Sequence, residues 1–144
     1  MATYRERAEE IAARIRAVEG SGVVHARNRV TEAWGDYADR FVHEDRVNGW
    51  QVTRQAPSKL DGHRWEEAYS LVKIYGVHDE SESDFAFQEN VDAVIRAFRD
   101  DGVLSFGTTA DGVRIDEMED RRFGDALCHV AECSMVVSFY YSEL

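Results

Sequence analysis

The sequence predicts one α+β domain over residues 1–144, in which a mostly antiparallel sheet of four to five strands is packed by two to three helices. Two segments, residues 4–18 and 83–100, repeat apolar residues at helical spacing. Segments with strand-like alternation follow one another through short turns, which favours antiparallel pairing with the helices on one face. A chain of 144 residues is long enough to bury a core without disulfides. The expected order is α-β-(α)-β-β-α-β-β.

The first element is a helix that begins after Thr3. Thr3 and Glu6 have the spacing of a capping box, in which the first side chain caps the helix and the second reaches back. Glycines at positions 20 and 22 stop the helix. Its apolar stripe covers only about two heptads, so it predicts a helix lying on a sheet and not a coiled coil. The stripe consists of Tyr4, Ala8, Ile11, Ile15 and Val18.

The next part of the chain predicts a strand, a weaker helix and a second strand. Residues 23–30 form a strand of mixed pattern, and residues 47–54 are the second strand candidate. Between them, residues 31–42 have helical spacing, although Gly35 costs about 1 kcal/mol of helix propensity. A turn-prone stretch follows over residues 56–62. The helix prediction rests on Trp34, Tyr37, Ala38, Phe41 and Val42.

The second half predicts three strands and the second strong helix. Residues 63–77 form a long strand with both faces partly covered, and the helix over residues 83–100 follows. Residues 113–118 form a strand, and the clearest alternation of all is in residues 127–141. In the long strand, Trp65, Tyr69, Leu71, Tyr75 and Val77 share one face, and Ala68, Val72 and Ile74 share the other.

Charge and composition narrow the class of protein. Acidic residues outnumber basic ones by 28 to 17, which gives a net charge of −11 and argues against specific DNA recognition. No apolar run approaches the roughly 20 residues that span a bilayer. The charged N-terminal segment lacks the apolar part of a secretory signal. The two cysteines do not form a disulfide framework, so we expect a reducing, cytoplasmic-type compartment.

Two groups of residues have ligand chemistry but do not predict a metal site. Cys128 and Cys133, with His129 and His63, contain zinc-ligand types, yet the two cysteines face opposite sides of one strand and lie roughly 16 Å apart. We expect Cys133 to pack in the core, Cys128 to lie at the surface, and His129 to be a hydrogen-bonded sheet histidine. The acidic residues 116–120, with Glu66 and Glu67, could hold Mg²⁺, but adjacent carboxylates on a strand diverge. A solvated edge or an interface charge cluster is the expected reading.

Catalytic and cofactor motifs do not appear in the sequence. The glycines at 20 and 22 follow a helix, so they do not form a phosphate-binding loop, and no nucleophile elbow is present. The histidines have no recognisable nucleophile partner in sequence. We therefore expect neither an enzyme nor a cofactor. A small metal- or ligand-binding enzyme that uses His63, His78 and the acidic run remains an alternative.

Aromatic and arginine residues are concentrated in the middle of the chain. Trp, Tyr and Arg are the residue types most enriched at interaction hot spots. Trp34 and Tyr37 are expected in the core. Trp50 stands in a polar stretch of strand and, with Arg54, is a candidate for a protein interface.

The arrangement resembles the tail terminator, or tail-completion, proteins of long-tailed bacteriophages. The resemblance covers nearly the whole chain as an order of elements and not as a sharp motif. It rests on the opening amphipathic helix, the 22–27 strand, the segment Asn48-Gly49-Trp50, the long strand ending Tyr75-Gly76-Val77, the helix start at 83–88 and the closing strand at 128–132.

The resemblance implies a virion protein of the tail or neck, assembled in the host cytoplasm. It implies a ring, usually a hexamer, that caps the completed tail tube, stops its polymerisation and offers a surface to the head connector. The partners would then be further copies of this chain, the tail tube protein and a head-completion protein. DNA would pass through an acidic lumen without specific binding. A head–tail connector, or neck protein, is the nearest alternative.

By analogy, we expect ring contacts in loops at residues 55–62 and 106–112. Arg27 and Arg29 are candidate subunit or tube contacts, although they could instead pair with Glu66 or Glu117 within one subunit. The full set of candidate interface residues is Arg27, Arg29, Trp50, Arg54, Asp61, Thr108 and Asp111.

Overall fold

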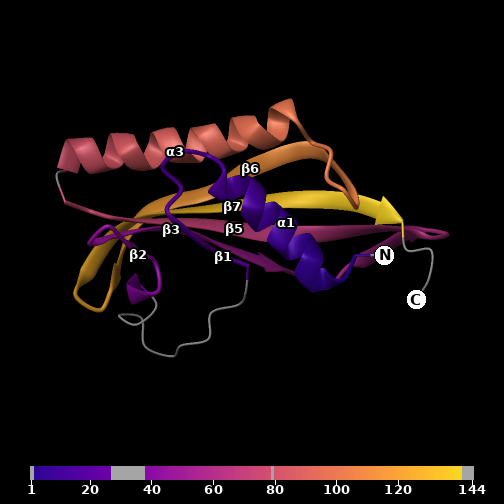
Figure 1. Ribbon diagram of the computed structural model, residues 1–144, viewed down its shortest axis with the longest axis horizontal. Coiled ribbons are helices and arrows are strands. Elements are labelled where there is room, and N and C mark those ends of the chain that lie inside the picture. The colour runs from indigo at the N-terminus through magenta and orange to yellow at the C-terminus, as the bar shows by residue number, and fades with distance from the viewer. Residues whose placement is uncertain (1, 27–37, 79, 141–144) are drawn as a thin grey trace.

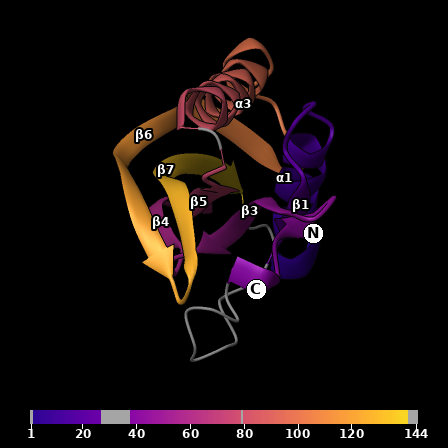
Figure 2. The ribbon, with the colours of Figure 1, turned by 90° about the vertical axis from the view of Figure 1, so that its left-hand side faces the viewer.

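Two helices lie on one face of a long, twisted sheet in the computed structural model, which describes residues 2–26, 38–78 and 80–140 (Figure 1). Figure 2 shows α3 and α1 side by side above the same face. This arrangement confirms the predicted single α+β domain. The elements are α1 (Tyr4–Arg16), β1 (Val23–His25), β2 (Val42–His43), β3 (Arg46–Arg54), β4 (Ser58–Asp61), β5 (Arg64–Gly76), α3 (Glu80–Asp100), β6 (Gly107–Phe123) and β7 (Ala126–Tyr140).

The sheet is mixed but mostly antiparallel, and it has more strands than the four to five predicted. The described strands form one sheet of seven, with the main order β1-β3-β5-β7-β6, while β2 pairs with β3 and β4 pairs with β5. Only β1 runs parallel to its neighbour, β3. Since β5 and β7 are both long, their antiparallel pairing extends from Arg64 opposite Tyr140 to Gly76 opposite Cys128.

The main core lies between the sheet and the two helices. Thr3 caps α1 as predicted, because its Oγ1 accepts a hydrogen bond from the N–H of Glu6 at 3.2 Å. α1 ends two residues before Val18, and α3 begins at Glu80, earlier than predicted. Both apolar stripes are buried against the strands, as predicted. The helix residues of this core are Ala8, Ile11, Ala12, Ile15, Phe87, Val91, Val94 and Phe98.

A second, smaller core covers part of the opposite face of the sheet. Ala38 and Phe41 pack there against Ile74, Phe123 and Cys128. Cys128 is fully buried, so the prediction that it lies at the surface is wrong. Ala38 and Phe41 come from a distant part of the chain, so alternation along one strand does not reveal that Cys128 is covered.

Several predicted boundaries differ in the structure. The strand predicted at 113–118 is the middle of β6, whose charged residues on both sides hide the alternation of a longer edge strand. The end of the predicted strand at 23–30 and most of the predicted helix at 31–42 lie outside the described residues. Val42, the last residue of that helix prediction, belongs instead to β2.

The rest of the opposite sheet face has no helix over it among the described elements. Residues of β5 and β7 with even numbers point to this side, because their odd-numbered neighbours belong to the main core. We call this surface the open face. It is made of Glu66, Ala68 and Ser70 from β5 and Ser134, Val136 and Ser138 from β7. In the described part of the chain, no helix is long and apolar enough to cross a membrane.

Candidate interaction site

Three of the predicted site residues come together at one end of the sheet. Arg54 is the last residue of β3. Asp61 ends β4 opposite Arg64, and Arg64 in turn pairs with Tyr140 near the end of β7. Thr108 is the second residue of β6, which runs antiparallel to β7. Because β7 ends where β5 and β6 begin, and β3 ends opposite Tyr69 further along β5, these residues lie toward the same end of the sheet, which we call the hairpin end after the β4–β5 hairpin.

The segments predicted as contact loops are largely strands. Half of 55–62 is β4, and most of 106–112 is the start of β6. Asp111 is exposed in the irregular stretch of β6 between Thr109 and Val113, where the register with β7 shifts. Neither segment shows apolar alternation; all four residues of β4 are exposed, whereas in 106–112 only Thr108 and Asp111 are exposed among the described side chains. Their strand structure therefore depends on pairing with β5 and β7.

The arginines and the tryptophan of the predicted site have different outcomes. Arg27 and Arg29 lie outside the described residues. Trp50 is completely buried, and its Nε1–H donates a hydrogen bond to Asn90 Oδ1 at 2.8 Å. The prediction that Trp50 is an interface residue is therefore wrong. The nearby polar residue Asn48 suggested a surface strand, but its side-chain oxygen accepts a hydrogen bond from the buried Lys73.

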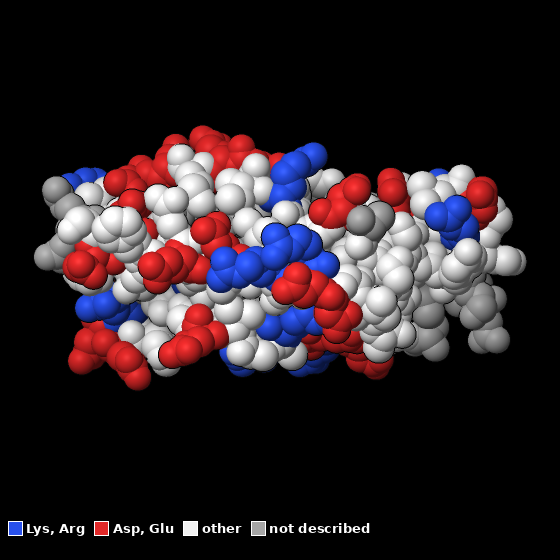
Figure 3. Space-filling view, turned by 90° about the horizontal axis from the view of Figure 1, so that it is seen from above, with Lys and Arg blue, Asp and Glu red and all other residues white. Residues whose placement is uncertain are grey.

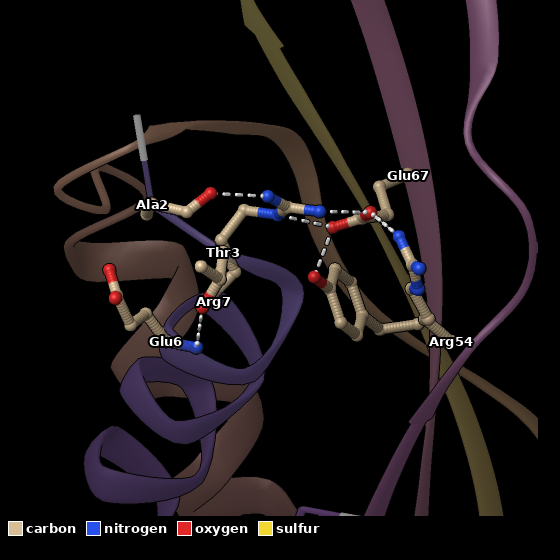
Figure 4. A network of polar contacts seen from close by, with 7 residues as sticks. Ala2, Thr3, Glu6, Arg7, Arg54 and Glu67 are labelled. Atoms are coloured by element: carbon tan, nitrogen blue, oxygen red, sulfur yellow. Dashed lines mark hydrogen bonds and ion pairs between the residues drawn. The ribbon is translucent and has the colours of Figure 1, made fainter. Parts of the chain in front are cut away.

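Arg54 belongs to a buried ionic cluster at the hairpin end, drawn in Figure 4. The carboxylate of Glu67, which has no exposed surface, accepts hydrogen bonds from Arg7 at 3.0 and 2.9 Å and from Arg54 at 2.6 Å. The hydroxyl of Tyr69 also donates to Glu67. The guanidinium of Arg54 lies over the ring of Tyr4, 4.0 Å from its centroid. Arg54 is therefore engaged within its own subunit, with part of its side chain still exposed.

The cluster attaches α1 to β3 and β5, two inner strands of the sheet. Arg7 comes from α1, whereas Glu67 lies on β5 and Arg54 on β3. Burial alone would raise the pKa of Glu67, but the hydrogen bonds from Arg7, Tyr69 and Arg54 outweigh it and lower that pKa. Burial and the adjacent carboxylate raise the pKa of Tyr69. Glu67 is thus a structural anion, separate from the exposed acidic run with which the sequence grouped it.

A cavity of about 250 Å³ opens on the open face beside the hairpin end. Two of its lining carboxylates, Glu66 and Asp111, have no hydrogen bond or ion pair to any described side chain. Arg114 has partners already, Asp116 at 2.9 Å and Ser134 at 3.3 Å. The remaining lining residues are Gly112, Met135, Val136 and Ser138. The cavity therefore offers negative charge next to an apolar side chain.

A second polar group joins α3 to β6 and β7. His129 is buried, as predicted for a satisfied sheet histidine, with Nε2 2.9 Å from Ser83 Oγ and Nδ1 2.6 Å from Asp120 Oδ1. The ring of Phe87 stacks on the imidazole at a centroid distance of 5.3 Å. This is the order of contacts in a Ser-His-Asp triad. Ser83 is completely buried, however, so no substrate atom reaches its Oγ, and the group acts as a clamp between elements.

Lys73 is a buried cation that the sequence analysis did not single out. Its side chain has no exposed surface, and Nζ donates to Asn48 Oδ1 at 2.5 Å and to the carbonyl of Gly20 at 3.3 Å. Nζ also lies 5.8 Å from the centroid of the Trp50 ring and 5.6 Å from that of Tyr75. Burial lowers the pKa of Lys73 to about 7. Only its position among apolar strand residues could have indicated this.

Potential metal ligands do not converge among the described residues. No group of three or more His, Cys, Asp or Glu side chains there could hold a metal ion. Cys133 belongs to the main core and Cys128 to the smaller one, so the two thiols face opposite ways as predicted. Burial raises the pKa of Cys128 to about 11 and that of Cys133 to about 12. Both thiols are free and held in the neutral form at physiological pH.

Acidic side chains are exposed on two other parts of the surface. Residues 116–120 of the edge strand β6 are exposed, which agrees with the expected solvated edge or interface charge cluster and does not distinguish them. Seen from above α3, Figure 3 shows acidic side chains gathered over the half of the molecule where this helix lies. The exposed acids of α3 include Glu82, Glu89, Asp92 and Asp100.

The hairpin end and the open face together form the candidate interaction site. The sequence indicated Asp61, Thr108 and Asp111 in this region but did not show that β-pairing brings them near Glu66 and Val136. The site has exposed charge, an accessible apolar side chain and a projecting hairpin. No protein-family model and no curated protein sequence matches this chain.

Proposed function

We propose that this protein is a structural subunit of a long-tailed bacteriophage virion that closes into a ring on the end of the tail tube. The observation that carries the proposal is the one-sided cover of the sheet. Helices pack on one face, while no described helix covers the open face or the hairpin end, which are therefore candidates for protein contacts. A ring needs two different surfaces on each subunit that fit one another, and a hairpin beside an uncovered face supplies such a pair.

Capping follows if the two faces of the ring differ. One face matches the tube subunits, and the other rejects a further tube ring but accepts a head-completion protein. The acidic surface over α3 suits a lumen through which DNA moves without adhering, since phosphates are repelled there. In this proposal the protein acts in the tail or neck of the virion after assembly in the host cytoplasm, most simply as a hexamer and without catalysis.

The test measures assembly directly. The purified chain is examined by size-exclusion chromatography with light scattering over a concentration series, and by negative-stain imaging with isolated tail tubes. A closed ring, or rings found only at tube ends, is the expected result. A monomer or dimer that ignores tubes at every concentration would contradict the proposal. Binding to portal-bearing heads in place of tubes would indicate a neck protein instead.

A further inference from the structure

The tip of the β4–β5 hairpin, residues 58–64, is basic, although the protein as a whole is strongly acidic. All four residues of β4 are exposed, and Figure 1 shows the hairpin reaching past the end of β7. Lys59 and Arg64 have no ion pair or side-chain hydrogen bond with any described residue. Asp61 offsets one of these charges, so residues 58–64 keep one net positive charge, and the acidic Glu66 and Glu67 follow further along β5. Leu60 is 44% exposed next to Lys59.

The cavity on the open face has the complementary character. Glu66 and Asp111 carry unpaired negative charge, whereas the nearby Arg114 is already held by Asp116. Val136, which is 44% exposed, offers apolar surface in the same cavity. Glu66 and Asp111 have no described partner and lie beside the exposed Val136. Together they can receive a basic side chain that stands next to an apolar one.

The two surfaces do not satisfy each other within one subunit. Arg64 and Glu66 point to the same side of β5, two residues apart, yet they form no ion pair. Residues so placed on a strand lie roughly 6–7 Å apart at their Cα atoms. The hairpin instead reaches past the end of β7, where no other described element packs on it (Figure 1).

We propose that the occupant of the cavity is the β4–β5 hairpin of a second copy of this chain, in a head-to-tail contact. Lys59 and Arg64 of one copy would face Glu66 and Asp111 of the next, with Leu60 against Val136. In this contact each copy binds one neighbour with its hairpin tip and a different neighbour with its adjacent cavity, so repetition closes a ring when the rotation per subunit fits. This inference rests on the proposed ring and names the residues that would build it.

The expected energetics favour specificity over strength. Exposed ion pairs each contribute only about 0–1 kcal/mol, so the charges orient the contact and reject wrong partners. Apolar contact between Leu60 and Val136 adds to each junction. Closure of the ring then makes the assembly more stable than a single contact would, because every copy binds two neighbours.

The test is a charge exchange between the two surfaces. One variant, Lys59→Glu with Arg64→Glu, makes the hairpin acidic, and a second, Glu66→Lys with Asp111→Lys, makes the cavity basic. Each variant repels itself and is expected to stay a single subunit, or to associate at least about tenfold more weakly than the unmodified chain. The equimolar mixture and the fourfold exchange variant both restore complementarity and are expected to assemble. Light scattering gives the masses, and circular dichroism confirms folding.

A matched control changes charge elsewhere on the surface. Arg96→Glu with Glu89→Lys alters two exposed residues of α3 and is expected to leave assembly unchanged. Rings formed by both paired variants alone would overturn the hairpin contact and leave the ring function standing. Failure of the mixture and of the fourfold variant to assemble would also overturn the contact. If the opposite variants pair but the unmodified chain never closes a ring, the contact stands and the proposed function fails.

Discussion

The buried ionisable residues Glu67 and Lys73 lie in opposite kinds of environment. Glu67 is stabilised as an anion by two arginines, whereas Lys73 has only neutral acceptors and aromatic rings around it. Removal of an ion from water without a counter-ion costs free energy, while an ion inside a matched cluster depends on every partner remaining in place. The two residues therefore respond differently to pH and to substitution.

The stability of the protein is expected to rise with pH because of Lys73. Its pKa is about 7 in the folded chain and 10.5 in the reference state. Between these values the unfolded chain binds more protons than the native one, so the free energy of unfolding increases as pH rises through this window. Below about pH 7 the contribution of this residue becomes constant.

Urea denaturation from pH 6 to 10 measures this effect. Lys73→Met is expected to reduce the increase in the free energy of unfolding with pH. The remaining titratable groups then determine the pH dependence. Lys59→Met, at an exposed lysine without partners, serves as the control and is expected to keep the rise. An unchanged slope in Lys73→Met would show that Lys73 does not titrate in this window.

Substitution of Glu67 is expected to be severe. Glu67→Gln removes the anion and leaves Arg7 and Arg54 against a neutral amide, at a cost of about 3–5 kcal/mol in the free energy of unfolding. Because its pKa is lowered by folding, the stabilisation from Glu67 is present above its unfolded pKa of about 4.5 and is lost as pH falls through the folded value. Chemical denaturation at pH 7 and pH 4 measures both effects.

The neighbouring residue supplies the control for this prediction. Glu66→Gln changes a carboxylate without described side-chain partners and is expected to alter stability by no more than about 0.5 kcal/mol. Equal losses for the two variants would mean that the buried cluster does not stabilise the fold.

At the scale of elements, polar contacts determine how α3 meets the sheet. Ser83 lies in the first turn of α3, and His129 and Asp120 lie on β7 and β6. The clamp holds this end of the helix where apolar packing comes mainly from Phe87. Such side-chain hydrogen bonds fix orientation more than they add stability.

A fluorophosphonate probe is expected not to label Ser83, because its Oγ is completely buried. Ser83→Ala is expected to lower the free energy of unfolding by about 1 kcal/mol, through loss of the hydrogen bond to His129. Mass spectrometry of the treated protein measures labelling, with a known serine hydrolase as the positive control. Labelling of the unmodified chain that disappears in Ser83→Ala would contradict the clamp and indicate an acyl-transfer site.

The elements with strong periodicity could be predicted from the sequence, and those held by distant partners could not. The stripes of α1 and α3 and the alternation of β7 reflect one buried side each. β6 was predicted too short because charges occupy both sides of an edge strand. Trp50 was assigned to an interface because its partner, Asn90, lies 40 residues further along the chain. The clamp on His129 was missed for the same reason.

At the scale of the whole molecule, the excess of acidic charge sets how the protein meets nucleic acid. The net charge is −11, and exposed acids gather over α3. Neutralisation of phosphates by cations supplies most non-specific affinity for DNA, and this surface offers few of them. The acidic surface over α3 and the basic tip of the β4–β5 hairpin are therefore expected to bind different partners.

We expect no retention of duplex DNA at an ionic strength of about 0.15 M. Gel-shift titration measures it, and a variant with Glu82→Lys, Glu89→Lys and Asp92→Lys on α3 provides the contrast. That variant is expected to bind DNA detectably and with a strong dependence on salt. Retention of DNA by the unmodified chain would contradict a repelling surface.

The strand order also determines when the protein can fold during synthesis. β7 lies between β5 and β6, although it is the last of the described strands to be made. Its pairing joins Arg64 to Tyr140, and such distant contacts slow folding because a long loop must close first. Until β7 has left the ribosome, β5 and β6 each lack a neighbouring strand. The apolar faces of both helices then have only part of the sheet to pack against. Protection of the nascent chain by chaperones is therefore most needed until β7 has emerged.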